Sequence, residues 1–386
     1  MDEDTFEKRY LGILKTLGRL AGIWPDQNKL VKYILWIILY SEIVTSVLVQ
    51  ITRIIHVKTV NVFIDHLPLI GTCLVFALKQ GNYVLNATKY KLLLKSMYRD
   101  WTMDRSDDEI AIMSKYAKRG TILAMFYIVN VTFCSILFLQ LPWTTRLLAW
   151  LQHSNTTPMI FVIPGYYFAD EHEIFYLIQL HGSLGIIFVA IVNMACDSSF
   201  TIVVQHACGL LAVTGYRFKH AIESYSYDIK NSEQWVKHNE RVRFSIIAHQ
   251  RAIGYVQQIE DTHATYLFLC IGIVICSFSI TLVKVATMDV CLDFYKYVSF
   301  LLIQLIHLFY LTIQGQFVEN VCDQLYNKIY EALWYNTNVK TQLLYVLALR
   351  RMLTPPRLTA GGLIDMNMES FSEVVKLSVS YYTVIR

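Results

Sequence analysis

Charged residues are scarce in this sequence. Asp, Glu, Lys and Arg together make up 17% of the 386 residues, whereas 55% of the residues are hydrophobic. Mean hydropathy is +0.39, which is too high for an ordinary soluble protein of this length. The composition therefore predicts a chain that crosses a membrane several times.

Residue patterns that mark disulfide frameworks, metal sites and catalytic centres are also missing. The eight cysteines are scattered and form no paired CxxC spacing, which excludes the sequence signature of a disulfide scaffold or a zinc site. The sequence contains no HExxH, GxSxG or P-loop motif and no pair of carboxylates within an apolar stretch. We therefore expect neither an enzyme nor a cofactor or metal.

The main positive feature of the sequence is a set of long apolar segments. A helix needs about 20 mainly apolar residues to cross a bilayer. Runs of that kind occur at 33–55, 63–85, 121–141, 174–204, 266–286 and 297–317, and a seventh, more polar one covers 365–386. The sequence thus predicts an all-α membrane protein with seven transmembrane helices.

The distribution of Lys and Arg predicts the orientation of these spans. The N-terminal segment and every second connection after it carry 27 of these cations, and the alternate connections carry five. Cationic loops stay on the cytoplasmic side, so the N-terminus is expected in the cytoplasm and the C-terminus outside. This orientation is opposite to that of a G-protein-coupled receptor. The sequon at Asn155 then lies outside and is a candidate glycosylation site, although a sequon alone is weak evidence.

The segment before the last span contains a helix break and a turn. Pro355 and Pro356 cannot continue a helix, and Gly361-Gly362 permits a sharp turn. The sequence therefore predicts a cytoplasmic helix at about 341–353 and a separate final helix after the turn.

From Ile246 onward the chain resembles the insect odorant receptor family, most densely in its last 70 or so residues. The residues that carry the resemblance are 249–259 (HQRAIGYVQQI), Gly315-Gln316, Tyr330-Glu331, Trp334-Tyr335, Arg350-Arg351, Pro355-Pro356, 358–361 (LTAG), Phe371 and 380–386 (SYYTVIR). The glutamine-containing signature that ends the last helix of the sister gustatory receptors is missing. The first two thirds of the chain fit the family mainly by topology.

The resemblance implies a function and a set of partners. Proteins of this family are odorant-gated, non-selective cation channels in the plasma membrane of olfactory sensory neurons, and they assemble as tetramers with a shared co-receptor subunit. The expected partners are a small volatile organic ligand, the co-receptor, membrane lipid and permeant cations, with no nucleic acid. The implied division is a cytoplasmic segment (1–32), a six-helix region with the pocket (33–317, with cytoplasmic helix extensions at 207–265), anchor helices (318–354), and the break with the pore helix (355–386).

Polar residues recur at three- and four-residue steps along the last span and form one stripe on a helix. The stripe comprises Glu369, Ser372, Glu373, Lys376, Ser380 and Thr383. It could face a pore, or it could be a polar seam between packed helices. The resemblance places Val384 where the family's channels close by a hydrophobic ring, although a lone valine can equally face lipid or pack.

The resemblance also suggests where a ligand binds and where subunits meet. The expected pocket lies in the outer half of the membrane, and its candidate residues are Thr72, Phe76, Phe133, Leu137, Gln179, Ser183, Tyr297 and Phe300. Each of these could instead be core packing. Trp334 and Tyr335 are candidates for a subunit interface or for packing within the subunit. His249 and His307 are better explained as hydrogen-bonded structural groups than as metal or proton sites.

Two other functions remain open at this point. A metabotropic seven-transmembrane receptor would need the opposite orientation, and the sequence has neither an Asp-Arg-Tyr triplet after the third span nor an Asn-Pro-x-x-Tyr break in the seventh. A small-molecule transporter with repeated halves would show an internal repeat, and none is visible.

Overall fold

The computed structural model describes residues 7–151, 153, 159–222, 232–289 and 292–385, and these residues are almost entirely helical. The chain begins with a π-helical turn, η1 (Glu7–Leu11), and a short helix, α2 (Gly12–Leu20). The long helices that follow are α3 (Lys29–Val57), α4 (Val60–Leu85), α5 (Ala87–Thr102), α6 (Asp107–Leu151), α7 (Phe175–His220), α8 (Ser232–Thr287) and α9 (Leu292–Tyr330). The C-terminal part comprises η2 (Trp334–Asn336), α10 (Val339–Met352), β1 (Thr359–Ala360), β2 (Ile364–Asp365) and α11 (Met368–Ile385). The predicted all-α fold class is confirmed.

Within the described part of the chain, six helices are long and apolar enough to cross a membrane, namely α3, α4, α6, α7, α8 and α9. They coincide with the first six predicted spans. The seventh predicted span is α11, which is shorter than expected because its helix begins only at Met368. Its 18 residues extend about 27 Å, and they include Glu369, Glu373 and Lys376.

One predicted boundary was wrong. The third predicted span, 121–141, ends before Pro142, but α6 continues through this proline to Leu151. A proline within a helix removes a single backbone donor, and nine further residues of helix follow it here. The connection therefore begins after Leu151.

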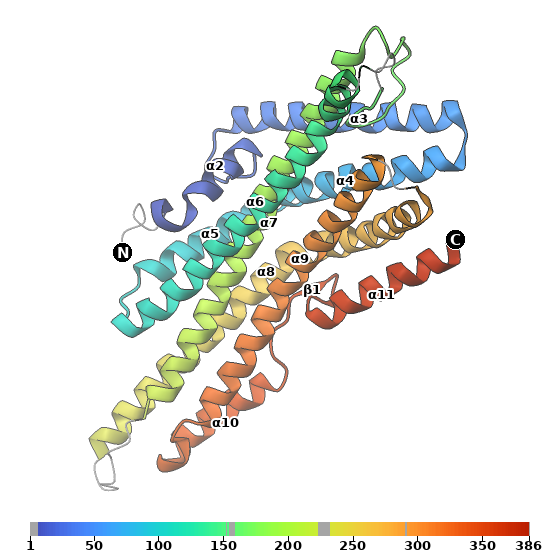
Figure 1. Ribbon diagram of the computed structural model, residues 1–386. Helices are drawn as coiled ribbons and strands as arrows, with labels where there is room; N and C mark the ends of the chain where they lie inside the picture. The colour runs from blue at the N-terminus through green and yellow to red at the C-terminus, as the bar shows by residue number, and fades with distance from the viewer. Residues whose placement is uncertain (1–6, 152, 154–158, 223–231, 290–291, 386) are drawn as a thin grey trace.

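The helices α7, α8 and α9 continue to one end of the molecule beyond α3 and α4, and α10 lies beside them there (Figure 1). The middle of α7 is buried on nearly every side, from Met194 to Gly215. This stretch is rich in Ala, Gly, Ser, Cys and Val, and small side chains let neighbouring helices approach closely. It is therefore the centre of the bundle, in contact with α6, α8 and α9.

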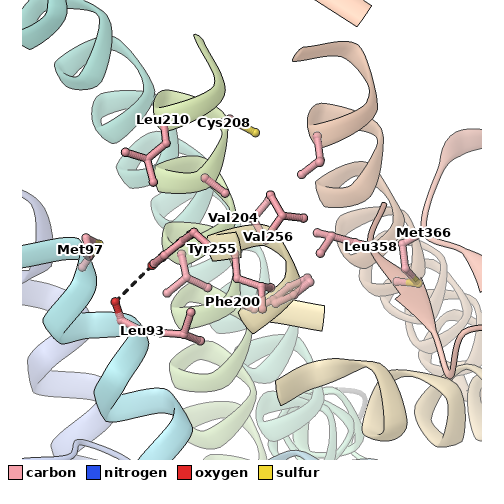
Figure 2. Packing of buried hydrophobic residues seen from close by; sticks show 14 of the residues in the cluster. Leu93, Met97, Phe200, Val204, Cys208, Leu210, Tyr255, Val256, Leu358 and Met366 are labelled. Atoms are coloured by element: carbon pink, nitrogen blue, oxygen red, sulfur yellow. Dashed lines mark hydrogen bonds between the residues drawn. The ribbon is translucent and has the colours of Figure 1, made fainter. Parts of the chain in front are cut away.

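Buried apolar side chains continue from α7 into the C-terminal part of the chain. Figure 2 shows Phe200 and Val204 of α7 packed between side chains of α5 and α8, with Leu358 and Met366 approaching from the segment beside β1 and β2. The hydroxyl of Tyr255 donates to the carbonyl of Leu93 at 3.4 Å and so ties α8 to α5. The core therefore joins elements that are far apart in sequence.

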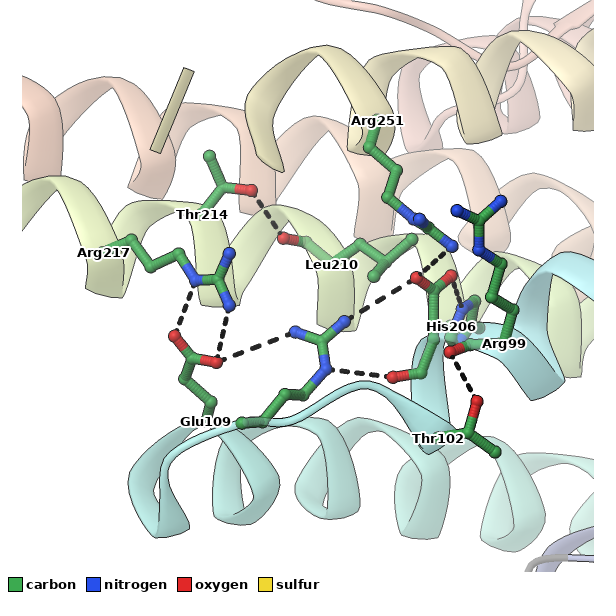
Figure 3. A network of polar contacts seen from close by, with 10 residues as sticks. Arg99, Thr102, Glu109, His206, Leu210, Thr214, Arg217 and Arg251 are labelled. Carbon is green, nitrogen blue, oxygen red and sulfur yellow. Dashed lines mark hydrogen bonds and ion pairs between the residues drawn. The ribbon is translucent and has the colours of Figure 1, made fainter. Parts of the chain in front are cut away.

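An ion-pair network joins the helices at the end that the charge count predicts to be cytoplasmic (Figure 3). Arg217 of α7 binds Glu109 of α6 through two bonds, Nε to Oε1 at 2.6 Å and Nη2 to Oε2 at 2.8 Å. The carboxylate of Asp100 in α5 is fully buried and contacts Arg251 of α8 at 2.6 Å and His206 of α7 at 3.0 Å. These contacts fix four helices to one another.

The predicted cytoplasmic helix is present as α10 and packs on α8 and α9. Its Tyr345 is fully buried and donates its hydroxyl to the carbonyl of Phe218 at 2.7 Å. Burial raises the pKa of Tyr345, which keeps the hydroxyl protonated as this donation requires. His249 is buried beside the same helix, with Nε2 3.1 Å from the sulfur of Met352, as expected for a structural histidine.

The predicted turn is a β-hairpin that docks against α8. Thr359 pairs with Asp365 and Ala360 with Ile364, and Gly361 and Gly362 both have positive φ, at +67° and +74°. The amide of Gly361 donates to the carbonyl of Ala264 in α8 at 2.9 Å. The hairpin thereby fixes the start of α11.

Candidate ligand-binding site

A cavity of about 180 Å³ lies among α3, α4, α6, α7, α8 and α9. One water molecule needs roughly 10–15 Å³ by this measure, so the space suits a molecule of about a dozen heavy atoms. Most of its wall is aliphatic or aromatic and includes Ile43, Leu69, Val75, Val131, Phe138, Ile163, Val189, Val274, Phe300, Ile303 and Ile306. Such a wall favours an apolar ligand.

A segment between α6 and α7 contributes Val162 and Ile163 to the cavity wall. It is held by Gln179 of α7, whose Oε1 accepts from the amide of Val162 at 3.1 Å and whose Nε2 donates to the carbonyl of Ile160 at 2.7 Å. From α3, the side chain of Arg53 donates to the carbonyl of Gly165 at 3.1 Å. Hydrogen bonds from the side chains of Gln179 and Arg53 to its backbone therefore hold this segment inward against the helices.

Two of the eight predicted pocket residues, Thr72 and Phe300, line this cavity. The other six lie outside its wall. Phe76 is fully buried, Phe133 is 59% exposed, Leu137 and Ser183 are partly buried, and Gln179 binds the segment just described. Tyr297 donates its hydroxyl to Asp65 at 3.2 Å. Whether any of the eight contacts a ligand stays a prediction.

Charged residues at one side of this cavity were missed by sequence reasoning. Nζ of Lys79 in α4 lies 2.6 Å from Oδ2 of Asp197 in α7 and 2.6 Å from Nε2 of His307 in α9. Tyr127 of α6 donates its hydroxyl to the same carboxylate oxygen. Lys79 and Asp197 are fully buried, whereas Tyr127 and His307 also line the cavity.

A sequence signal for this cluster did exist. Lys79 was included among the 27 cations of the predicted cytoplasmic segments, although it stands within the predicted span 63–85; it lies inside α4 and is completely buried. Asp197 stands inside the predicted fourth span without a neighbouring cation in sequence. An isolated charge within a span marks a partner elsewhere in the bundle, so these two residues could have been paired.

The predicted stripe on α11 is exposed on the single chain. Glu369, Glu373, Lys376, Ser380 and Thr383 are all exposed and Ser372 is half-buried. The buried side of the helix carries Ser370, Val374 and Ser378 and packs on α8 and α9. The side chain of Val384 lies outside the described residues, as does the whole of Asn155.

Close packing fixes the start of α11 against α9. A Cβ atom on Gly315 would stand 1.8 Å from the carbonyl oxygen of Met366, so only glycine fits there. The next residue, Gln316, accepts a hydrogen bond from the amide of Met368 at 3.1 Å, which satisfies a free donor in the first turn of α11.

The candidate interface residues differ in exposure. Trp334 is half-buried against the core and donates to the carbonyl of Tyr330 at 3.2 Å, whereas Tyr335 is 60% exposed. Further apolar side chains are exposed on α10, which follows Tyr335 in the chain, among them Val339, Leu343 and Leu347.

The fold and the cavity together define a multi-pass helical membrane protein with an internal cavity whose wall is mainly apolar. The chain matches the family described as 7tm Odorant receptor over residues 59–379, and it belongs to that family.

Solved structures agree with this fold. The insect olfactory receptor OR5 from Machilis hrabei, in complex with eugenol, superposes with a TM-score of 0.79 at 11% sequence identity, covering 99% of each chain. A second structure of OR5 from Machilis hrabei gives a TM-score of 0.75 at 10% identity, covering 100% of this chain and 99% of that one. At such low identity the likeness shows the fold alone. No curated protein matches the sequence.

Proposed function

We propose that this chain is the odorant-binding tuning subunit of a ligand-gated, non-selective cation channel. In this proposal it works with a shared co-receptor subunit, as a hetero-oligomer that is a tetramer, in the plasma membrane of olfactory sensory neurons. The observation that carries the proposal is the apolar cavity of about 180 Å³ within the helical bundle of an odorant receptor family member. OR5, which has a similar fold, has a structure in complex with the small molecule eugenol.

The exposed stripe on α11 supports a pore at this helix. Glu373 and Lys376 are exposed on the single chain, on the part of α11 that does not pack on α8 and α9. A charge facing lipid at mid-membrane costs about 2.5–3.5 kcal/mol, so such residues face water or another subunit. A central pore surrounded by α11 from each subunit supplies both. In this arrangement Val384 forms part of the hydrophobic gate near the outer end.

The exposed apolar face of α10 and the neighbouring Tyr335 supports an assembly. Val339 is 78% exposed, Leu343 is 57% exposed and Tyr335 is 60% exposed. Contiguous apolar side chains at a surface outside the bilayer mark a contact with another protein. We assign this face to the contact with neighbouring subunits and place it in the cytoplasm, which follows from the charge distribution.

The test is a recording of odorant-evoked current from cells that express this chain with the co-receptor. A panel of small volatiles should evoke current that persists in excised patches without nucleotides, which a metabotropic receptor would not sustain. A saturating substrate flux without current would instead indicate a transporter. Silence across a broad panel despite surface delivery would overturn the proposal.

A pair of variants on α6 connects the current to the cavity. Val131 lines the cavity, whereas Val129 is 60% exposed and does not. Val131→Phe should reduce the volume available to the ligand and shift or abolish the response. Val129→Phe adds the same side chain to the outer surface of the same helix and should leave the response unchanged.

A further inference from the structure

The cavity carries a second tier of polar groups, one helical turn away from the charged cluster. Asn130 follows Tyr127 by three residues on α6, Asn193 precedes Asp197 by four on α7, and Gln304 precedes His307 by three on α9. Residues three or four apart lie on the same face of a helix.

All three tiered amides line the cavity. The helix α6 runs antiparallel to α7 and α9. Asn130 comes after its cluster residue in sequence, whereas Asn193 and Gln304 come before theirs, so all three lie on the same side of the charged cluster. They form one layer, which we call the amide tier.

Several acceptor atoms in and near this tier have no hydrogen-bond partner among the residues that the structure describes. Among the described residues, Oδ1 of Asn193 and Oε1 of Gln304 are buried and accept no hydrogen bond. Gln304 is only 8% exposed. On α3, Gln50 adds a third such oxygen to the cavity wall, and its Nε2 already donates to the carbonyl of Ser46 at 3.0 Å. That donation fixes the free atom of Gln50 as an acceptor.

A buried acceptor without a hydrogen bond costs free energy. Three such acceptors around one cavity therefore favour a bound molecule that can donate a hydrogen bond. Most of the remaining wall is apolar, which favours an apolar molecule with a single polar group as the donor. A hydroxyl can donate to an amide oxygen and also accept from an amide nitrogen, whereas an ether, ester or ketone can only accept. A hydroxyl therefore fits the tier whichever way an amide is turned.

We propose that the amide tier recognises the hydroxyl of the ligand, so that this receptor binds small apolar alcohols and phenols in preference to ethers of the same size. The single O–H of the ligand donates to the amide oxygen of Gln304, and the apolar wall holds the carbon skeleton. The inference rests on the proposed function only in that the cavity is the ligand site.

Two pairs of isomers test it on the purified full chain in detergent micelles. 1-Octanol and 1-methoxyheptane have the same formula, as do 4-ethylphenol and 4-methylanisole, and each pair differs mainly in the presence of an O–H. Affinities are read from the ligand-dependent rise in melting temperature. Each hydroxyl compound should bind about tenfold more tightly than its ether isomer, the effect of one net hydrogen bond in a buried site.

A variant locates the effect. Gln304→Met removes the acceptor at similar volume, and it should bring the ratio of the two affinities close to one while leaving the affinity for the ether unchanged. Gln257→Met makes the same change at an exposed position on α8 and should keep the tenfold preference. If Gln304→Met does not fold, the isomer comparison on the unaltered chain still decides.

Equal affinity within both pairs, or no binding of either hydroxyl compound, would overturn the inference. These outcomes are separate from the fate of the proposed channel. A hydroxyl preference without any current would leave the inference standing and remove the channel. Odorant-evoked current with equal responses to both members of each pair would do the reverse.

Discussion

Replacement of Lys79 by methionine should destabilise the receptor strongly, because it leaves a buried carboxylate without its cation. Nζ of Lys79 contacts Asp197 at 2.6 Å, and both side chains are fully buried. The hydrogen bond from Tyr127 and the contact with His307, whose Nε2 lies 3.4 Å from the carboxylate, remain in the variant. Neither neighbour supplies the full positive charge that is lost.

The magnitude follows from the burial. Removing one partner of a buried ion pair costs about 3–5 kcal/mol, because the remaining charge is desolvated without compensation. On the scale known for soluble domains this corresponds to a fall in melting temperature on the order of 10 °C. Removing both charges, by Lys79→Met with Asp197→Leu, should recover most of the loss.

The effect is measured by heating the purified chain in detergent and using size-exclusion chromatography to quantify the fraction that remains folded. Lys91→Met is the matched control. Its ammonium lies 2.9 Å from Asp26, but the two side chains are 59% and 67% exposed, and such surface pairs contribute at most about 1 kcal/mol. The argument from burial is wrong if Lys79→Met and Lys91→Met have the same melting temperature. It is also wrong if the double variant is less stable than Lys79→Met alone.

Three further perturbations test other parts of the structure. Gly315→Ala should destabilise the junction of α9 and α11 by about 1–3 kcal/mol and lower odorant-evoked current, because its Cβ would overlap the carbonyl of Met366; unchanged melting and current would contradict the close approach. Glu109→Gln should lower the melting temperature by less than Lys79→Met, since Arg217 is 28% exposed and water can solvate it; an equal or larger loss would show that exposure does not set the cost. Val384→Ala should raise basal current in cells that also express the co-receptor if this residue gates the pore, and an unchanged basal current would remove it from the gate.

The spans could be predicted from sequence because the bilayer demands a continuous apolar run whatever the tertiary contacts are. The pocket residues could not be predicted in the same way. Gln179 is a polar residue beside aromatic side chains and was a reasonable candidate for ligand contact. In the structure both ends of its amide satisfy backbone groups of the segment at 160–162, a need that only the folded chain reveals.

Charge counting had a similar limit. It uses the number of cations in a connection and takes no account of the surroundings of each side chain. Lys79 was therefore treated as one more cytoplasmic lysine, although its partner Asp197 is 118 residues away in sequence. The stripe on α11 was predictable from its period, but the packed side formed by Ser370, Val374 and Ser378 depends on how α8 and α9 are placed.

In the proposed channel, α9 is the element shared by the cavity and the pore helix. Gln304 and His307 face the cavity, and Gly315 meets the start of α11 about 12–16 Å further along the same helix. The contact at Gly315 leaves no free space between the two backbones, and Gln316 adds a hydrogen bond to α11. If a ligand displaces α9, the start of α11 must therefore move with it. For the same reason, variants at Gly315 should alter gating without altering the preference between hydroxyl and ether ligands.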